Sequence, residues 1–100
     1  MNHYTNRDGY NGIVAALSWL FRAGQPRGGR PFGAFFTLFP RGTPRLAKKL
    51  RIPREKTEYV FTFVDLGDLL PLPGGRGACI FYSPADYAVE SDRQIYAGKA

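Results

Sequence analysis

The segment that most constrains the fold is residues 58–66, EYVFTFVDL, in which β-branched and aromatic side chains follow one another with little interruption. Such side chains fit the pleated, half-buried surface of a sheet, so this segment is predicted to be a strand. Residues 33–39 and 77–83 have a similar apolar and aromatic content, and residues 94–97 are a candidate for a short last strand. Gly and Pro dominate the stretches between them, which predicts turns and loops there.

Two segments have the pattern of short helices. Apolar residues recur at helical spacing up to Leu20, and Asn6 or Thr5 can cap the N-terminus, which predicts a helix from Asp8 to Leu20. The pair Thr43–Pro44 precedes the sequence RLAKKL and predicts a second helix with Pro at its first position.

The order of these segments predicts the fold class. With the β-prone residues 2–5 (NHYT) at the start, the chain reads β-α-β-α-β-β-β, which indicates an α+β fold with a mostly antiparallel sheet. A length of 100 residues, 44% of them hydrophobic and 15% aromatic, predicts one small domain, residues 1–100, rather than a disordered chain.

The single cysteine and the single histidine exclude two kinds of site. Cys79 has no partner for an intrachain disulfide, and its apolar surroundings favour a buried structural thiol. One Cys and His3 together cannot close a zinc site. No run of apolar residues is long enough for a transmembrane helix, and no secretory signal is expected at the N-terminus, so no membrane partner is predicted.

The charge balance leaves several partners open. Fourteen Lys and Arg against eight Asp and Glu give a net charge of +6, which suits nucleic acid, an anionic membrane surface, a phosphate-bearing ligand or an acidic protein. Residues 45–56, RLAKKLRIPREK, resemble the start of a helix-turn-helix. The strand-like TEYVFTFV follows where a recognition helix would stand, so a helix with a basic outer face is the favoured interpretation.

Several motifs recur in one order along the chain. His3-Tyr4-Thr5 is followed by Gly12-Ile13, then by RPFGAFFT at residues 30–37 and by Pro40-Arg41-Gly42-Thr43. The strand at 58–66 and a closing Asp92-Arg93 come after them. Taken together, over nearly the whole chain, this order resembles the small ADP-ribosyltransferase toxin domains of the H-Y-D type.

The resemblance implies a fold and an activity. It implies a small split β-sheet with two short helices, and an enzyme that cleaves the nicotinamide–ribose bond of NAD⁺ and transfers ADP-ribose to a protein or nucleic-acid acceptor. It also implies a bacterial toxin domain that is secreted or delivered into the cytoplasm of a target cell and is paired with a cognate immunity protein. Two alternatives stay open: an NAD⁺ glycohydrolase of the same fold, or a non-catalytic basic module that binds nucleic acid or protein.

The resemblance also assigns binding residues. His3, Tyr4 and Thr5 of the first motif are assigned to NAD⁺ binding. His3, which is also assigned to catalysis, would hydrogen-bond a ribose hydroxyl and position the dinucleotide, since imidazole can donate and accept. In the second motif Gly33, Phe35 and Thr37 match the family's glycine, aromatic residue and threonine. Phe35 replaces the usual tyrosine but keeps the aromatic face that stacks on nicotinamide. Strand alternation puts Phe35 and Phe39 on one face of the sheet and Phe36 on the other.

Two further roles follow from the resemblance. Arg30, the arginine nearest the second motif, would bind the pyrophosphate of NAD⁺. An acid late in the chain would stabilise the positive charge that develops on the ribose. Glu90 is the first choice because AVE begins a plausible strand, Asp86 in a turn after Pro84 is the second, and Asp92 is the third.

Overall fold

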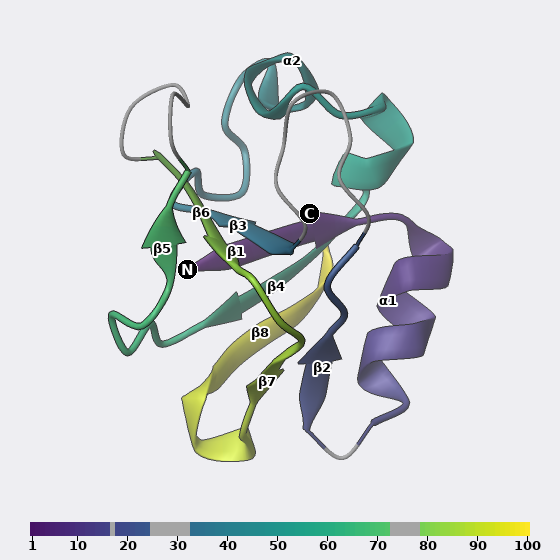
Figure 1. Cartoon of the computed structure of the whole chain (residues 1–100). Helices are drawn as coiled ribbons and strands as arrows, with labels where there is room; N and C mark the ends of the chain where they lie inside the picture. Colours follow the sequence, from purple (N-terminus) through teal and green to yellow (C-terminus); the bar gives the residue numbers. More distant parts are fainter. Residues whose placement is uncertain (17, 25–32, 73–78) are drawn as a thin grey trace.

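An antiparallel sheet of six strands forms the centre of the part of the chain that the computed structural model describes, residues 1–16, 18–24, 33–72 and 79–100. Its spatial order is β5-β6-β3-β1-β4-β8, and a second sheet pairs β2 with β7 (Figure 1). The strands are β1 (Asn2–Thr5), β2 (Trp19–Phe21), β3 (Ala34–Thr37), β4 (Tyr59–Phe63), β5 (Leu70–Pro71), β6 (Ile80–Ser83), β7 (Tyr87–Val89) and β8 (Gln94–Lys99). Every pairing between them is antiparallel, which confirms the predicted α+β class.

The four predicted strands are confirmed, with different ends. The segment 58–66 contributes β4, 33–39 contributes β3, and 94–97 is extended to the full length of β8. The segment 77–83 contributes β6, and its first two residues lie outside the described residues. Pairing sets these ends, because a strand stops where its neighbour no longer offers backbone groups to bond.

The first helix is shorter than predicted. Helix α1 spans Arg7–Val14, and the side chain of Asn6 caps it by accepting a hydrogen bond of 2.9 Å from the amide of Gly9. The predicted continuation to Leu20 is wrong, because Trp19–Phe21 forms β2 and pairs with β7. Extended backbone lets Trp19 and Phe21 both enter the core, and this burial outweighs the helical spacing of the sequence.

The second helix begins later than predicted. Helix α2 spans Leu46–Leu50 because Arg45 has a left-handed backbone, with φ of 57°, so Pro44 lies in the preceding turn and not at the first helical position. A 3₁₀ turn, η1 (Arg54–Thr57), follows and leads directly into β4. No recognition helix stands in this described stretch, so the helix-turn-helix interpretation is wrong.

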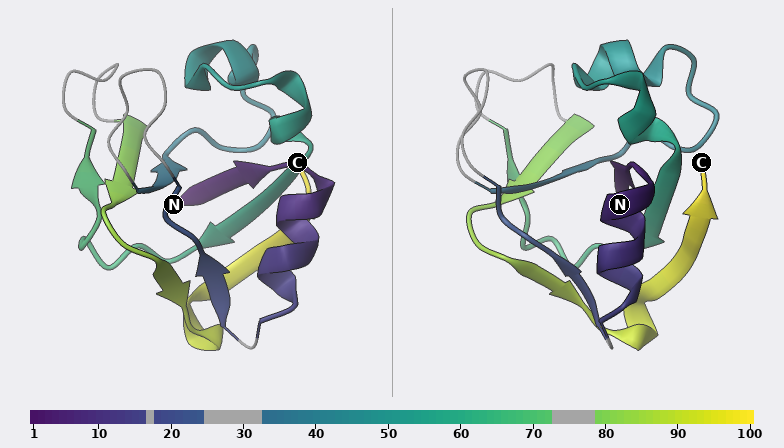
Figure 2. Two further views of the ribbon diagram at one scale, coloured as in Figure 1. Left: turned by 45° about the vertical axis from the view of Figure 1, so that its right-hand side comes forward. Right: turned by 90° about the vertical axis from the view of Figure 1, so that its right-hand side faces the viewer.

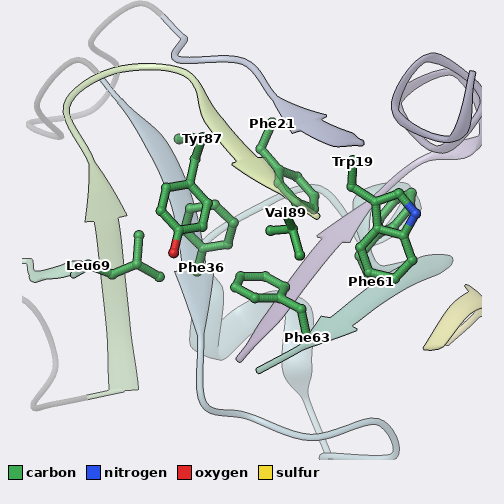
Figure 3. Close-up of a cluster of buried hydrophobic side chains, with 9 residues drawn as sticks. Trp19, Phe21, Phe36, Phe61, Phe63, Leu69, Tyr87 and Val89 are labelled. Carbon is green, nitrogen blue, oxygen red and sulfur yellow. The ribbon is translucent and has the colours of Figure 1, made fainter. Parts of the chain in front are cut away.

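Two apolar clusters pack against the central sheet. The larger cluster joins β2 and β7 to residues of β3 and β4 that point toward them (Figure 3); its members are Trp19, Phe21, Ala34, Phe36, Phe61, Phe63, Leu69, Tyr87 and Val89. The smaller cluster has Tyr4, Leu50, Val60 and Ile80 at its centre, with side chains of the α2 segment around them. Figure 2 shows α2 at the opposite end of the molecule from β2 and β7 in both views.

The two clusters confirm the predicted alternation along β3. Phe36 belongs to the larger cluster, whereas Phe35 and Phe39 pack against the smaller one. The aromatic rings of the larger cluster meet mostly edge to face, as between Phe36 and Phe63, whose centroids are 5.5 Å apart at 85°. Such pairs add roughly 0.5–1.5 kcal/mol each beyond the area they bury.

Two glycines of α1 give a matched test of this packing. A methyl group added at Gly12 would meet nothing within 4 Å, whereas one added at Gly9 would overlap the hydroxyl of Thr5. We therefore expect Gly12→Ala to raise the free energy of unfolding by about 0.5–1 kcal/mol, because Ala is the better helix former. Gly9→Ala should lower it by about 1 kcal/mol or more, because β1 and α1 are forced apart. Urea unfolding measures both, and equal stabilisation by both variants would contradict the close approach of α1 to β1.

Candidate functional site

The sheet opens between β1 and β3, and the imidazole of His3 lies at this opening. The two strands pair only at Asn2 and Thr37, although β1 pairs with β4 along all four of its residues. Beyond Asn2, the Nδ1 of His3 lies 2.8 Å from the carbonyl oxygen of Phe35. The side chain of His3 therefore hydrogen-bonds to β3 at a position where, in a longer ladder, the backbone of β1 would do so.

Aromatic rings surround this imidazole. Its centroid lies 4.7 Å from that of Phe21, 5.6 Å from that of Phe36 and 6.5 Å from that of Phe61. Phe21 reaches it from β2, and the other two rings come from the central sheet. His3 is thus held from three sides by apolar groups, which leaves it little freedom to rotate.

These surroundings fix the protonation of His3. Loss of hydration on burial lowers the pKa of His3 to about 4. The hydrogen bond to Phe35 raises this pKa and the positive charge of Lys56 lowers it, but both effects are smaller than that of burial. The ring is therefore neutral at pH 7. A carbonyl only accepts hydrogen bonds, so Nδ1 carries the proton and Nε2 keeps its lone pair.

Nε2 of His3 is free to accept a hydrogen bond from outside the chain. It has no partner among the described residues. Within the same residues, no side-chain nitrogen or oxygen is both buried and unpartnered. Nε2 is therefore reachable from accessible space, and a neutral imidazole nitrogen there is an acceptor for a hydroxyl group.

A cavity of about 90 Å³ lies beside His3. Strands β1, β3 and β6 and the end of α2 supply its walls, which are His3, Tyr4, Phe35, Phe36, Thr37, Leu50, Ile52 and Ile80. The hydroxyl of Tyr4 donates to the carbonyl of Phe39 at 2.8 Å, and that of Thr37 donates to the carbonyl of Cys79 at 2.7 Å. Both hydroxyls are therefore committed to the protein.

Four of the binding residues predicted from the motifs meet at this cavity. His3 and Tyr4 come from the first motif, and Phe35 and Thr37 come from the second. Thr5 is buried against α1, so it does not line the cavity.

Gly33 pairs with Gly24 at the start of β3, and Arg30 lies outside the described residues. A Cβ at Gly33 would come within 2.6 Å of the backbone oxygen of Ser83, so only glycine fits there.

The candidate acids lie away from the cavity walls. The side chain of Glu90 accepts a hydrogen bond of 2.9 Å from the hydroxyl of Ser18, and that of Asp86 accepts one of 2.8 Å from the amide of Ala23. Both residues are exposed, as is Asp92 in the 3₁₀ turn η3 (Ser91–Arg93). None of the three lines the described cavity.

The pairing of β2 with β7 distinguishes the two leading acids. Tyr87 stands opposite Phe21, the ring that covers His3, and Asp86 directly precedes Tyr87. Glu90 comes four residues after Asp86, so the two lie roughly 13 Å apart along an extended chain. Asp86 is thus at the end of β7 that is nearer to His3.

Several residues of the site were missed by sequence reasoning. Phe21 lies just past the end of the predicted first helix and had no assigned role, and Leu50, Ile52 and Ile80 had none beyond the core. Nothing in local periodicity marks them, because the cavity forms only when β6 and α2 come together from distant parts of the chain.

Comparison of the chain with protein-family models, with curated proteins and with solved structures gives no match. In the described ranges no group of three or more His, Cys, Asp or Glu side chains is placed to hold a metal ion. No helix in the described part of the chain has the length and apolar character needed to cross a membrane.

Burial of neutral His3 predicts a pH-dependent stability. The pKa is about 4 in the folded chain and 6.5 without the fold, so the unfolded chain binds more protons between these values. The free energy of unfolding should therefore fall by roughly 3 kcal/mol as the pH is lowered from 6.5 to 4, with the full contribution present above pH 6.5. Urea unfolding across this range measures the loss, and His3→Gln should remove most of the slope. An unchanged slope in this variant would show that the carboxylates alone cause it.

Proposed function

We propose that this chain binds NAD⁺ with its nicotinamide–ribose end at the His3 cavity and transfers ADP-ribose to an acceptor. The observation that carries the proposal is that His3, Tyr4, Phe35 and Thr37, from two motifs about 30 residues apart, line one cavity. This meeting of the two motifs beside His3, whose Nε2 has no partner among the described residues, supports an NAD⁺ site of this type. An ADP-ribosyltransferase-like fold is part of the same proposal.

The size of the cavity limits what can enter it. Pockets for whole ligands have volumes of about 300–1,000 Å³, so a cavity of about 90 Å³ holds only a small part of a dinucleotide. We assign it to the nicotinamide–ribose end, with the nicotinamide ring against Phe35 and a ribose hydroxyl reaching Nε2 of His3 through the opening between β1 and β3. The adenosine and pyrophosphate parts then lie outside the cavity, where the net positive charge of the chain favours them.

Neutral His3 suits a positioning role. With a pKa of about 4 it is not a proton donor at pH 7, and its Nε2 can hold a hydroxyl in one orientation. Its hydrogen bond to Phe35 ties the orientation of the imidazole to the strand that carries the stacking ring. The two groups that would contact NAD⁺ thus move together.

The reaction needs a carboxylate near the ribose. When the bond between nicotinamide and C1′ breaks, nicotinamide leaves with the bonding electron pair and positive charge develops on the ribose. We assign the stabilising carboxylate to Asp86, because β2 and β7 place it nearer to His3 than Glu90. A nucleophile of the acceptor then bonds to C1′ and loses its proton, whereas attack by water would give hydrolysis.

The acid is tested by release of nicotinamide from NAD⁺. Asp86→Asn keeps an oxygen for the amide of Ala23 but removes the charge, so we expect turnover to fall by about a hundredfold or more. Glu90→Gln keeps an acceptor for Ser18 and should leave turnover within a few-fold of the parent chain.

The two variants serve as controls for each other, because each preserves a hydrogen bond to the fold. Loss of turnover in Glu90→Gln alone would instead make Glu90 the acid. Absence of nicotinamide release from the parent chain, with and without cell lysate, would overturn the enzymatic proposal. Release that depends on lysate, with label from NAD⁺ recovered on a macromolecule, is the result expected for transfer rather than hydrolysis.

A further inference from the structure

Half of the fourteen Lys and Arg residues fall between residues 41 and 56, a stretch with one acidic residue, Glu55. All seven of these basic residues are exposed. The stretch contains α2 and η1, and the side chains of Leu50 and Ile52 within it line the His3 cavity. A strongly positive surface therefore borders the proposed site.

Three cations in and beside this stretch rest on aromatic rings, and a fourth hydrogen-bonds one of the same aromatic side chains. The guanidinium of Arg41 lies 4.0 Å from the ring centre of Tyr96, the ammonium of Lys49 lies 5.6 Å from that of Phe39, and the ammonium of Lys99 lies 4.9 Å from that of Tyr59. Arg7 hydrogen-bonds the phenol of Tyr59, which lowers the pKa of that phenol. We call Arg7, Arg41, Lys49 and Lys99 the basic belt.

The belt is continuous across elements that are far apart in the sequence. Phe39 and Tyr96 pack against the same apolar cluster, and Arg41 reaches the carbonyl of Lys99 at 3.5 Å. Arg7 and Lys99 share Tyr59. Tyr59 of β4 pairs with Thr5, just before α1, on one side and with Lys99 of β8 on the other, and in the left view of Figure 2 the end of β8 lies close to η1 and the start of α1.

The charges of the belt are not neutralised within the described part of the chain. None of its four cations forms an ion pair with a described carboxylate, although Asp8 and Glu58 lie near Arg7. The ring contacts and the hydrogen bond of Arg7 to Tyr59 hold the cations in place without cancelling their charge, and Arg41 has further N–H groups for a ligand besides the one that donates to Lys99. A row of fixed, unpaired cations is complementary to a polyanion.

The surface composition favours nucleic acid over protein as that polyanion. The centre of a protein interface is rich in apolar anchors and poor in Lys. The described side chains that are large, hydrophobic and exposed are Val14, Leu38, Val64, Leu66, Leu70 and Ile95, and none of them lies between residues 41 and 56. Planar Arg groups also stack on unpaired bases.

We propose that the basic belt binds single-stranded nucleic acid along its phosphate backbone and leads it past the His3 cavity. This inference rests on the proposed function, and it makes nucleic acid the class of acceptor to which ADP-ribose is transferred. Binding itself does not depend on turnover, so it is measured without NAD⁺, and the two proposals can fail separately.

The test is the salt dependence of binding to labelled oligo(U) and oligo(dT) of about 16 nucleotides. If all four belt cations contact phosphates, the affinity should fall about 50-fold between about 50 and 200 mM salt. Arg41→Gln with Lys99→Gln removes two contacts, so the fall should shrink to about sevenfold. Tighter binding of oligo(U) would identify the bound strand as RNA, and tighter binding of oligo(dT) would identify it as DNA. Equal binding would mean that the belt binds both kinds of strand.

Arg22→Glu is the matched control. It changes the net charge by two units, as the double variant does, but this exposed residue directly follows β2, and Figure 2 shows β2 at the opposite end of the molecule from α2. This control should keep the parent salt dependence, and circular dichroism should show that all variants remain folded. An equal change of the salt dependence in the control and in the double variant would overturn the proposal that the basic belt binds nucleic acid. So would absence of oligonucleotide binding, or equal competition by poly-glutamate, which would indicate an acidic protein partner.

Discussion

The hydrogen bond from Nδ1 of His3 to the carbonyl of Phe35 is the interaction on which the proposed site depends. It spans the place where β1 and β3 stop pairing, so it holds two central strands together without a backbone ladder. The same bond directs Nε2 of His3 away from Phe35, with its lone pair free. One contact therefore fixes an opening in the sheet, the tautomer of a histidine and the position of an aromatic residue.

The larger aromatic cluster makes that arrangement possible. Phe21, Phe36 and Phe61 pack around the imidazole, and its loss of hydration keeps it neutral at pH 7 and makes its burial costly under acid conditions. Strand β2 contributes to both the core and the site, since it carries Phe21, which lies against His3, and pairs with β7, which begins directly after Asp86. The core and the proposed site are thus built from the same side chains, and a change in one is expected to alter the other.

Local sequence patterns predicted part of the fold and part of the site. The β-branched and aromatic side chains of residues 58–66 predict a strand, of which Tyr59–Phe63 forms β4, and strand geometry predicts the alternation of Phe35 and Phe36. The start of β2 was assigned wrongly to a helix, because the successive apolar residues of Trp19–Phe21 fit a buried helix as well as a strand. The pairing of β2 with β7 joins residues about 70 positions apart, which local periodicity does not encode. For the same reason local patterns group His3 with Phe35 through their motifs but do not order Asp86 and Glu90 by their distance from His3.

The most direct measurement is the titration of NAD⁺ into the chain with isotopically labelled imidazole nitrogens, followed by NMR at pH 7. His3 is the single histidine, so every imidazole signal belongs to the site. Our account predicts a neutral ring with the proton on Nδ1 and a shift confined mainly to Nε2 as NAD⁺ binds. A proton on Nε2 in the free chain, or an Nε2 signal that does not move at saturating NAD⁺, would contradict the placement of the ribose at His3.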